Sequence, residues 1–271
     1  AYEICACLVG SEMCIRDSEE FYTRLAECDE LPKTSQPSPD TFMKVFNEAV
    51  AAGDDVLGIF ISSDLSGTYQ SACLAALDVE EETRKKLYMV DSRSASIGTA
   101  LLIREAVKLR DAGVNVSDIA AACTEMSKYI KLTAVVGSLK YLKMGGRLSG
   151  AAAFAGTMLH ITPVVSIEDG KVVVIGKTRG KKAAEKLMHD KLIKDGLSLT
   201  RDFMFGHINC SESLETFINK SLTYISDVNG NVGVSSIGCS VGTHVGPGTY
   251  GIAYVEAAES GMNRESIVKT A

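Results

Sequence analysis

Short apolar runs alternate with helical patterns of apolar residues along the first half of the chain, from residue 38 onward. Ser38 suits an N-cap, Pro39 the first position of a helix and Gly53 a left-handed C-cap, so a helix is expected between them. A continuous apolar run at 56–61 predicts a strand that is buried on both faces. The other elements expected here are helices at 71–77, 96–112 and 117–129 and a strand at 87–90. Strand, polar turn and helix in repetition predict a parallel, doubly wound sheet.

The pattern changes after residue 130, where hairpins mix with helices. Two apolar runs joined by Asp169 and Gly170 carry the strongest short signal for a β-hairpin. The elements expected here are strands at 132–136, 161–167, 171–175, 203–208, 232–239 and 250–255, and helices at 139–144, 181–192 and 211–224. The sequence therefore predicts an α/β protein of two domains. A parallel, doubly wound α/β domain is expected over residues 1–130, and a mixed or antiparallel α+β domain over residues 131–271.

Composition and charge exclude several classes of protein. Apolar residues make up 46% of the 271 residues and charged residues 23%, which is typical of a chain with a packed core and excludes wholesale disorder. The net charge of −6 argues against a nucleic-acid partner. The most apolar long stretch, 150–167, lacks the run of about 20 apolar residues that a membrane span needs. The eight scattered cysteines and the lack of a secretory signal indicate a cytoplasmic protein without a metal or cofactor.

Four polar segments interrupt the apolar elements and carry the candidate chemistry, at 33–39, 62–69, 145–149 and 242–248. Ser66 lies just before an expected helix, where free backbone N–H groups and the helix dipole favour an anion. The adjacent Gly67 would let a ligand approach the backbone closely. The alternative is that Ser66 and Ser38 only cap their own helices. Two hydroxyl-rich turns at the ligand-binding edge of an α/β sheet favour a site.

Three cationic or titratable residues lie in glycine-rich settings. Arg147 follows two glycines and Arg179 precedes one, so either guanidinium is able to hold a carboxylate or phosphate through two hydrogen bonds. The alternative for both arginines is a helix-capping or solvent-facing role. His244 lies between glycines on an expected loop, where it is unsuited to filling a core and where stabilising the turn is the alternative.

An enzymatic hypothesis comes from residues 238–242, which match the G-x-S-x-G pattern of serine hydrolases around Ser240. The pattern requires a helix next, whereas Pro247 and several glycines follow. His244 also precedes Glu256, which reverses the usual order of acid and histidine. An acyl hydrolase that uses Ser66 or Ser240 stays an alternative, and it needs a histidine within hydrogen-bond reach of the serine.

Six segments between residues 17 and 256 resemble the DegV family, which includes the fatty-acid-binding subunits of bacterial fatty acid kinase. They are KTSQPSP, FISSDLSGTYQSACLAA, VDSRSASIG, LKYLKMGGRLS, KTRGKKA and GTHVGPGTYGIAY. The resemblance implies a non-enzymatic two-domain protein that holds one long-chain fatty acid with its carboxylate near the domain junction. It also implies a separate ATP-dependent kinase that phosphorylates the bound acid. By motif position, Thr34 and Ser66 would hold the carboxylate, while Arg147, Arg179 and His244 would line the mouth that faces the kinase.

Physical chemistry agrees with such a ligand. Burial of an acyl chain of about 16 carbons is worth roughly 11–12 kcal/mol at about 0.8 kcal/mol per methylene. Association costs about 4 kcal/mol or more, which leaves useful affinity. A buried carboxylate needs donors, which hydroxyls and helix N–H groups supply. The apolar stretch 154–161 is expected either to line the acyl tunnel or to pack in the core. A lipid-sensing regulatory protein without a kinase partner stays a second alternative.

The first 16 residues depart from the family pattern. Family members begin with a strand that carries an Asp-Ser motif, and this chain instead contains SEMCIRDS, which resembles a translated sequencing adapter. A truncated or chimeric start is therefore expected, with a first domain that lacks an inner strand.

Overall fold

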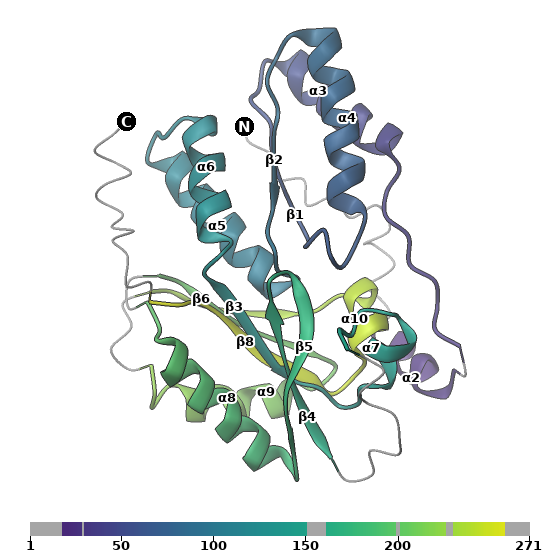
Figure 1. The fold of residues 1–271 in the computed structure, drawn as a ribbon, viewed down its shortest axis with the longest axis vertical. Helices are drawn as coiled ribbons and strands as arrows, with labels where there is room; N and C mark the ends of the chain where they lie inside the picture. Colours follow the sequence, from purple (N-terminus) through teal and green to yellow (C-terminus); the bar gives the residue numbers. More distant parts are fainter. Residues whose placement is uncertain (1–17, 29, 151–160, 199–200, 226–229, 258–271) are drawn as a thin grey trace.

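The computed structural model describes residues 18–28, 30–150, 161–198, 201–225 and 230–257. Its upper part contains a two-stranded parallel sheet with helices on both sides (Figure 1). The elements of this part are α2 (Ser18–Glu27), α3 (Pro39–Ala52), β1 (Leu57–Phe60), α4 (Thr68–Thr83), β2 (Tyr88–Asp91), α5 (Ile97–Asp111) and α6 (Val116–Met126). Of these, α2 lies apart from the small sheet, beside the lower part of the molecule.

The lower part is built on a six-stranded sheet in the order β5-β4-β3-β8-β6-β7, in which all neighbours are antiparallel except β6 and β7. Helices α5 and α6 lie over one face of this sheet, and α8 and α9 cover the other (Figure 1). The elements are β3 (Ile130–Val135), α7 (Lys140–Met144), β4 (Thr162–Glu168), β5 (Lys171–Thr178), α8 (Lys181–Asp195), β6 (Phe203–Ile208), α9 (Ser211–Ser221), β7 (Val232–Ser236), α10 (Cys239–Val245) and β8 (Thr249–Val255).

The predicted fold class is confirmed, since the molecule combines a parallel sheet with a mixed one. Local signals also hold in detail: Ser38 accepts a hydrogen bond from the backbone N–H of Thr41, and Gly53 ends α3 with a φ of +89°. The hairpin between β4 and β5 turns through Asp169 and Gly170, which both have positive φ as a type I′ turn requires.

Two elements differ from the sequence prediction. Helix α2 was not predicted, and residues 237–239, expected to end a strand, instead lead into α10. Helix α10 contains a glycine and is seven residues long, so its own sequence has little tendency to form a helix and packing must stabilise it.

The predicted division between residues 130 and 131 falls at the start of β3 and stays a prediction. Helices α5 and α6 share a core with residues of the large sheet. Its members from that sheet are Ile130, Met204, Ala253 and Val255. The two parts of the molecule are therefore joined by a continuous apolar contact.

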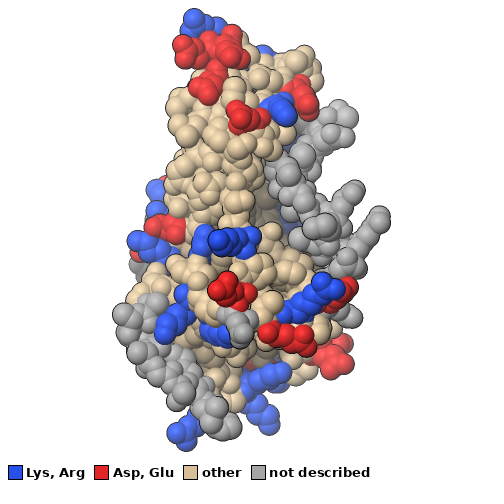
Figure 2. Space-filling model, turned by 90° about the vertical axis from the view of Figure 1, so that its right-hand side faces the viewer, with Lys and Arg blue, Asp and Glu red and all other residues tan. Residues whose placement is uncertain are grey.

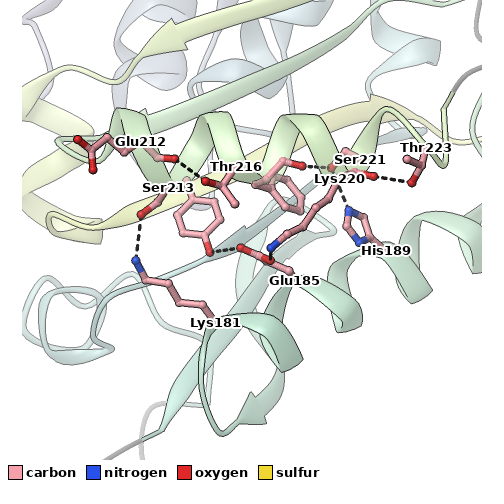
Figure 3. Close-up of polar contacts among 11 residues, drawn as sticks. Lys181, Glu185, His189, Glu212, Ser213, Thr216, Lys220, Ser221 and Thr223 are labelled. Carbon is pink, nitrogen blue, oxygen red and sulfur yellow. Dashed lines mark hydrogen bonds and ion pairs between the residues drawn. The ribbon is translucent and has the colours of Figure 1, made fainter.

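Polar side chains connect α8 to α9 beneath the six-stranded sheet (Figure 3). The buried carboxylate of Glu185 accepts hydrogen bonds from Lys220 Nζ at 2.6 Å and Tyr250 Oη at 3.0 Å. His189 Nε2 lies 2.9 Å from Ser221 Oγ, which itself donates to the carbonyl of Phe217. His189 therefore donates to Ser221 through Nε2, and these contacts hold the two helices in register.

The stability of the protein is expected to fall as the pH drops below 6.5, in part because of His189. Burial has the largest effect on this ring and lowers its pKa. The charge of Glu185 raises the pKa, and the charge of Lys220 lowers it. A depressed pKa means that the unfolded chain takes up the proton first, so the stabilising contribution is complete above pH 6.5 and is lost as the pH falls through the folded value.

Urea unfolding between pH 7.5 and about 5 tests this expectation. The His189→Gln variant should show a shallower decline of the unfolding free energy than the unchanged protein. His207 and His244, whose pKa values burial also lowers, remain in both proteins and supply the common background. Equal slopes would contradict the role assigned to His189.

No helix within the described ranges is both long and apolar enough to cross a membrane.

Candidate functional site

The segment that connects α2 to α3, residues 30–38, runs up one side of the molecule and passes α10 (Figure 1). On this connecting segment the exposed Thr34 places its Oγ1 2.7 Å from Nε2 of His244, although 210 positions separate the two residues. His244 lies in the last turn of α10. Two residues that the sequence analysis singled out separately therefore belong to one constellation.

His244 is held as a neutral ring. Burial lowers its pKa, and the nearby charge of Arg147 lowers it further. Its buried Nδ1 has no hydrogen-bond partner among the described residues, so the proton is assigned to Nε2, which has the Thr34 hydroxyl as its acceptor. Thr34 then keeps its own hydroxyl proton for an anionic ligand.

Ser66 forms the turn that precedes α4. Its Oγ accepts the backbone N–H of Thr68 at 3.3 Å and lies 2.8 Å from Thr68 Oγ1, a local contact within the turn, whereas the N-cap residue of α4 is Gly67. Ser66 is only half-buried. A Cβ built on Gly67 would lie 2.8 Å from Nε2 of Gln36, which shows that this amide rests directly on the glycine. Gly67 thus allows the connecting segment to close over the Ser66 turn.

Arg147 joins the Ser66 turn to the turn after α7. Its Nε donates to the carbonyl of Leu65 at 3.2 Å, and its Nη1 donates to the carbonyl of Gly145 at 2.6 Å. A Cβ on Gly145 would lie 3.3 Å from Cε1 of His244, so ring and turn are in contact. These contacts use two of the five guanidinium donors, and the described contacts leave Nη2 for a ligand.

The structure thus brings together four of the five predicted residues: Thr34, Ser66, Arg147 and His244. Arg179 lies apart from them, exposed between β5 and α8, and no contact among the described residues joins it to the other four. The roles of all five at a carboxylate stay predictions. Sequence reasoning missed Gln36 and the glycine contacts, although Gln36 lies within the KTSQPSP segment.

The edge of the small parallel sheet, where a ligand was expected, is partly covered by the β4–β5 hairpin. Ser62 Oγ donates to the carbonyl of Gly170 at 2.8 Å, and Arg93 pairs with Asp169 at 2.9 Å. The four grouped residues lie beside this contact. On the face shown in Figure 2, the upper part is largely uncharged between the charged groups at its outer tip and those on the lower part.

The hydrolase alternative gains nothing from the geometry. The short helix α10 begins within the G-x-S-x-G pattern at Cys239 and ends at Val245, before Gly246 and Pro247, and Ser240 is exposed in its first turn. No hydrogen bond between described residues joins Ser66 or Ser240 to a histidine ring. The described histidine–serine pair, His189 and Ser221, is fully buried and its hydroxyl donates to a backbone carbonyl.

Two expectations concern parts of the chain outside the described residues. The apolar stretch 154–161 is one, apart from its last residue, and the atypical start of the chain is the other. Neither the acyl tunnel nor the expected loss of an inner strand is therefore tested.

The fold and the grouped residues define a class: an α/β protein of two sheets that gathers hydroxyl, guanidinium and imidazole donors where its two parts meet. A family model described as uncharacterised proteins of the DegV family matches residues 12–257. The chain belongs to the DegV family.

Individual relatives agree with this assignment. The chain is 36% identical over 247 residues to a DegV domain-containing protein of Clostridium acetobutylicum, covering 88% of this chain and 82% of the relative. It is 33% identical over 246 residues to a protein of Thermotoga maritima named fatty acid-binding protein. This match covers 87% of this chain and 82% of the relative. A solved structure of a fatty-acid-binding DegV family protein from Thermus thermophilus superposes on this chain with a TM-score of 0.78 at 30% sequence identity. The superposition covers 89% of this chain and 85% of the Thermus protein.

Proposed function

We propose that this chain binds one long-chain fatty acid and holds its carboxylate between the connecting segment and the Ser66 turn. The observation that carries the proposal is the contact of Thr34 with His244 at 2.7 Å, beside the Ser66 turn that Arg147 reaches. In this arrangement Thr34 and Ser66 donate hydrogen bonds to the carboxylate, and Arg147 supplies a compensating positive charge. The named binding of the Thermotoga and Thermus relatives supports the same ligand class.

We further propose that the protein presents the acid to a separate ATP-dependent fatty acid kinase in the cytoplasm and has no catalytic turnover of its own. This step rests on the motif resemblance, which assigns Arg147, Arg179 and His244 to the mouth that faces the kinase. The exposed position of Arg179 between β5 and α8 suits contact with a partner. Hydroxyl donors support phosphoryl transfer because they hold a carboxylate without neutralising its nucleophilic charge.

The first experiment is native mass spectrometry of the full chain purified from a bacterial host, followed by denaturing extraction of bound lipid. One fatty acid per chain is the expected result, and it would also identify the preferred chain length. A folded protein that is empty and binds no added palmitate would contradict the proposal. Incubation of the loaded protein with a bacterial fatty acid kinase and ATP should then yield acyl phosphate; stable binding without phosphorylation would favour the lipid-sensing alternative.

Ser66→Ala is expected to weaken palmitate binding about tenfold or more, because a hydrogen bond to a charged group contributes about 1.5–3 kcal/mol. Isothermal titration measures the change. Ser240→Ala is the matched control, since Ser240 is exposed and makes no described contact with the grouped residues. Unchanged affinity in Ser66→Ala would remove Ser66 from the site and leave it only its local contact with Thr68.

A further inference from the structure

Helix α10, which carries His244, packs against both α2 and α7 (Figure 1). On the α2 side the ring of Tyr22 lies directly on Gly242. A Cβ built on this glycine would lie 2.6 Å from Cε1 and 2.7 Å from Cζ of the ring, which is closer than any side chain tolerates. Tyr22 is buried, and its hydroxyl donates to the carbonyl of Ile237, two residues before α10 begins.

The α7 side repeats this arrangement. The ring of Tyr141 lies on Gly246, where a Cβ would be 2.8 Å from Cγ of the ring. His244 lies midway between the two glycines, two residues after Gly242 and two before Gly246. Both rings belong to one apolar cluster that also contains Ile237 and Val245. Gly242 within α10 and Gly246 at its C-cap therefore each allow an aromatic ring to approach the backbone, one before and one after the histidine in the sequence.

A seven-residue helix is too short to be stable alone, so its position depends on these contacts. The side chain of His244 must be placed to within a few tenths of an ångström to keep the 2.7 Å contact between its Nε2 and Thr34 Oγ1. Packing against backbone without an intervening Cβ leaves little freedom for translation or rotation of the helix.

We propose that Tyr22 of α2 is a positioning residue, which acts through Gly242 to place His244 against Thr34. The consequence of this positioning is the orientation of the Thr34 hydroxyl toward a carboxylate, and that consequence rests on the proposed function. Tyr141 of α7 serves in the same way through Gly246, the residue that ends α10. The connecting segment follows α2 directly in the chain. Helix α2 therefore fixes the position of His244 and also the start of the segment that carries Thr34.

The test compares a glycine-to-alanine variant within α10 with one at the N-cap of the same helix, four residues earlier. Gly242→Ala introduces a methyl group into the Tyr22 ring, whereas a Cβ on Gly238 meets no atom within 4 Å. The imidazole of His244 is followed by NMR through a pH titration of the full chain without ligand. Burial also lowers the pKa of His207 on β6, which serves as the internal reference.

In Gly242→Ala the His244 ring is expected to leave its buried position, so that its pKa rises toward 6.5 while His207 is unchanged. Palmitate affinity should fall about tenfold, the equivalent of roughly one hydrogen bond. Gly238→Ala should match the unchanged protein in both measurements. Tyr22→Phe keeps the ring and should retain the His244 titration, whereas Tyr22→Leu removes the ring and should shift it as Gly242→Ala does.

A His244 titration that is the same in Gly242→Ala, Tyr22→Leu and the unchanged protein would overturn the inference. If Gly242→Ala does not fold, the comparison of Tyr22→Leu with Tyr22→Phe decides in the same way. The proposed function fails independently of this result: an unchanged protein that binds no palmitate, together with a shifted His244 in the variants, would leave the positioning role intact and remove its ligand.

Discussion

Replacing Arg201 with methionine is expected to lower the free energy of unfolding by about 3–5 kcal/mol, the cost of breaking a buried ion pair by removal of one partner. Arg201 Nη1 pairs with Glu105 Oε1, and both side chains are more than nine-tenths buried. The pair connects α5 to the chain just before β6. Burial and then the charge of Glu105 raise the pKa of the neighbouring Cys123 to about 12.

Urea unfolding measures the loss, with Arg24→Met as the matched control. Arg24 pairs with Glu20 on the exposed face of α2, so the same substitution there should change the unfolding free energy by about 0.5 kcal/mol or less. Replacing Glu105 with leucine in the Arg201→Met background should recover much of the stability, because both members of the buried ion pair are then replaced by apolar side chains. An equal loss of unfolding free energy in Arg201→Met and Arg24→Met would show that burial adds nothing to the contribution of the Arg201–Glu105 pair.

Thr34→Val is expected to weaken palmitate binding by about 10- to 150-fold, which corresponds to the loss of about 1.5–3 kcal/mol from a hydrogen bond to a charged group. Valine keeps the shape of threonine but neither donates to a carboxylate nor accepts from His244 Nε2. Because Thr34 is exposed, its replacement should change the unfolding free energy by about 0.5 kcal/mol or less.

Thr34→Ser restores the hydroxyl without the methyl group and should bind within about threefold of the unchanged protein. Isothermal titration of the three proteins with palmitate, together with their urea unfolding, separates binding from stability. Equal affinity of the valine and threonine proteins would mean that the carboxylate lies elsewhere, and equal loss in the serine and valine variants would point to the methyl group instead of the hydroxyl.

The candidate site was identified from the sequence only in part. The motifs named Thr34, Ser66, Arg147 and His244 one by one, and each lies in a polar segment that interrupts an apolar pattern. Their grouping was not predictable from spacing, because the contact between Thr34 and His244 spans 210 positions. Arg179 has an equally suggestive sequence setting, yet it lies apart from the other four.

The sequence by itself determined the elements whose causes are local. Ser38 and Gly53 cap α3 through their own backbone and side-chain geometry, and Asp169 with Gly170 turns the hairpin because both accept positive φ. Helix α10 has no such local cause. The rings of Tyr22 and Tyr141 pack on Gly242 and on the C-cap Gly246, and the tertiary structure alone brings those rings there, since burial against distant segments outweighs weak intrinsic propensity.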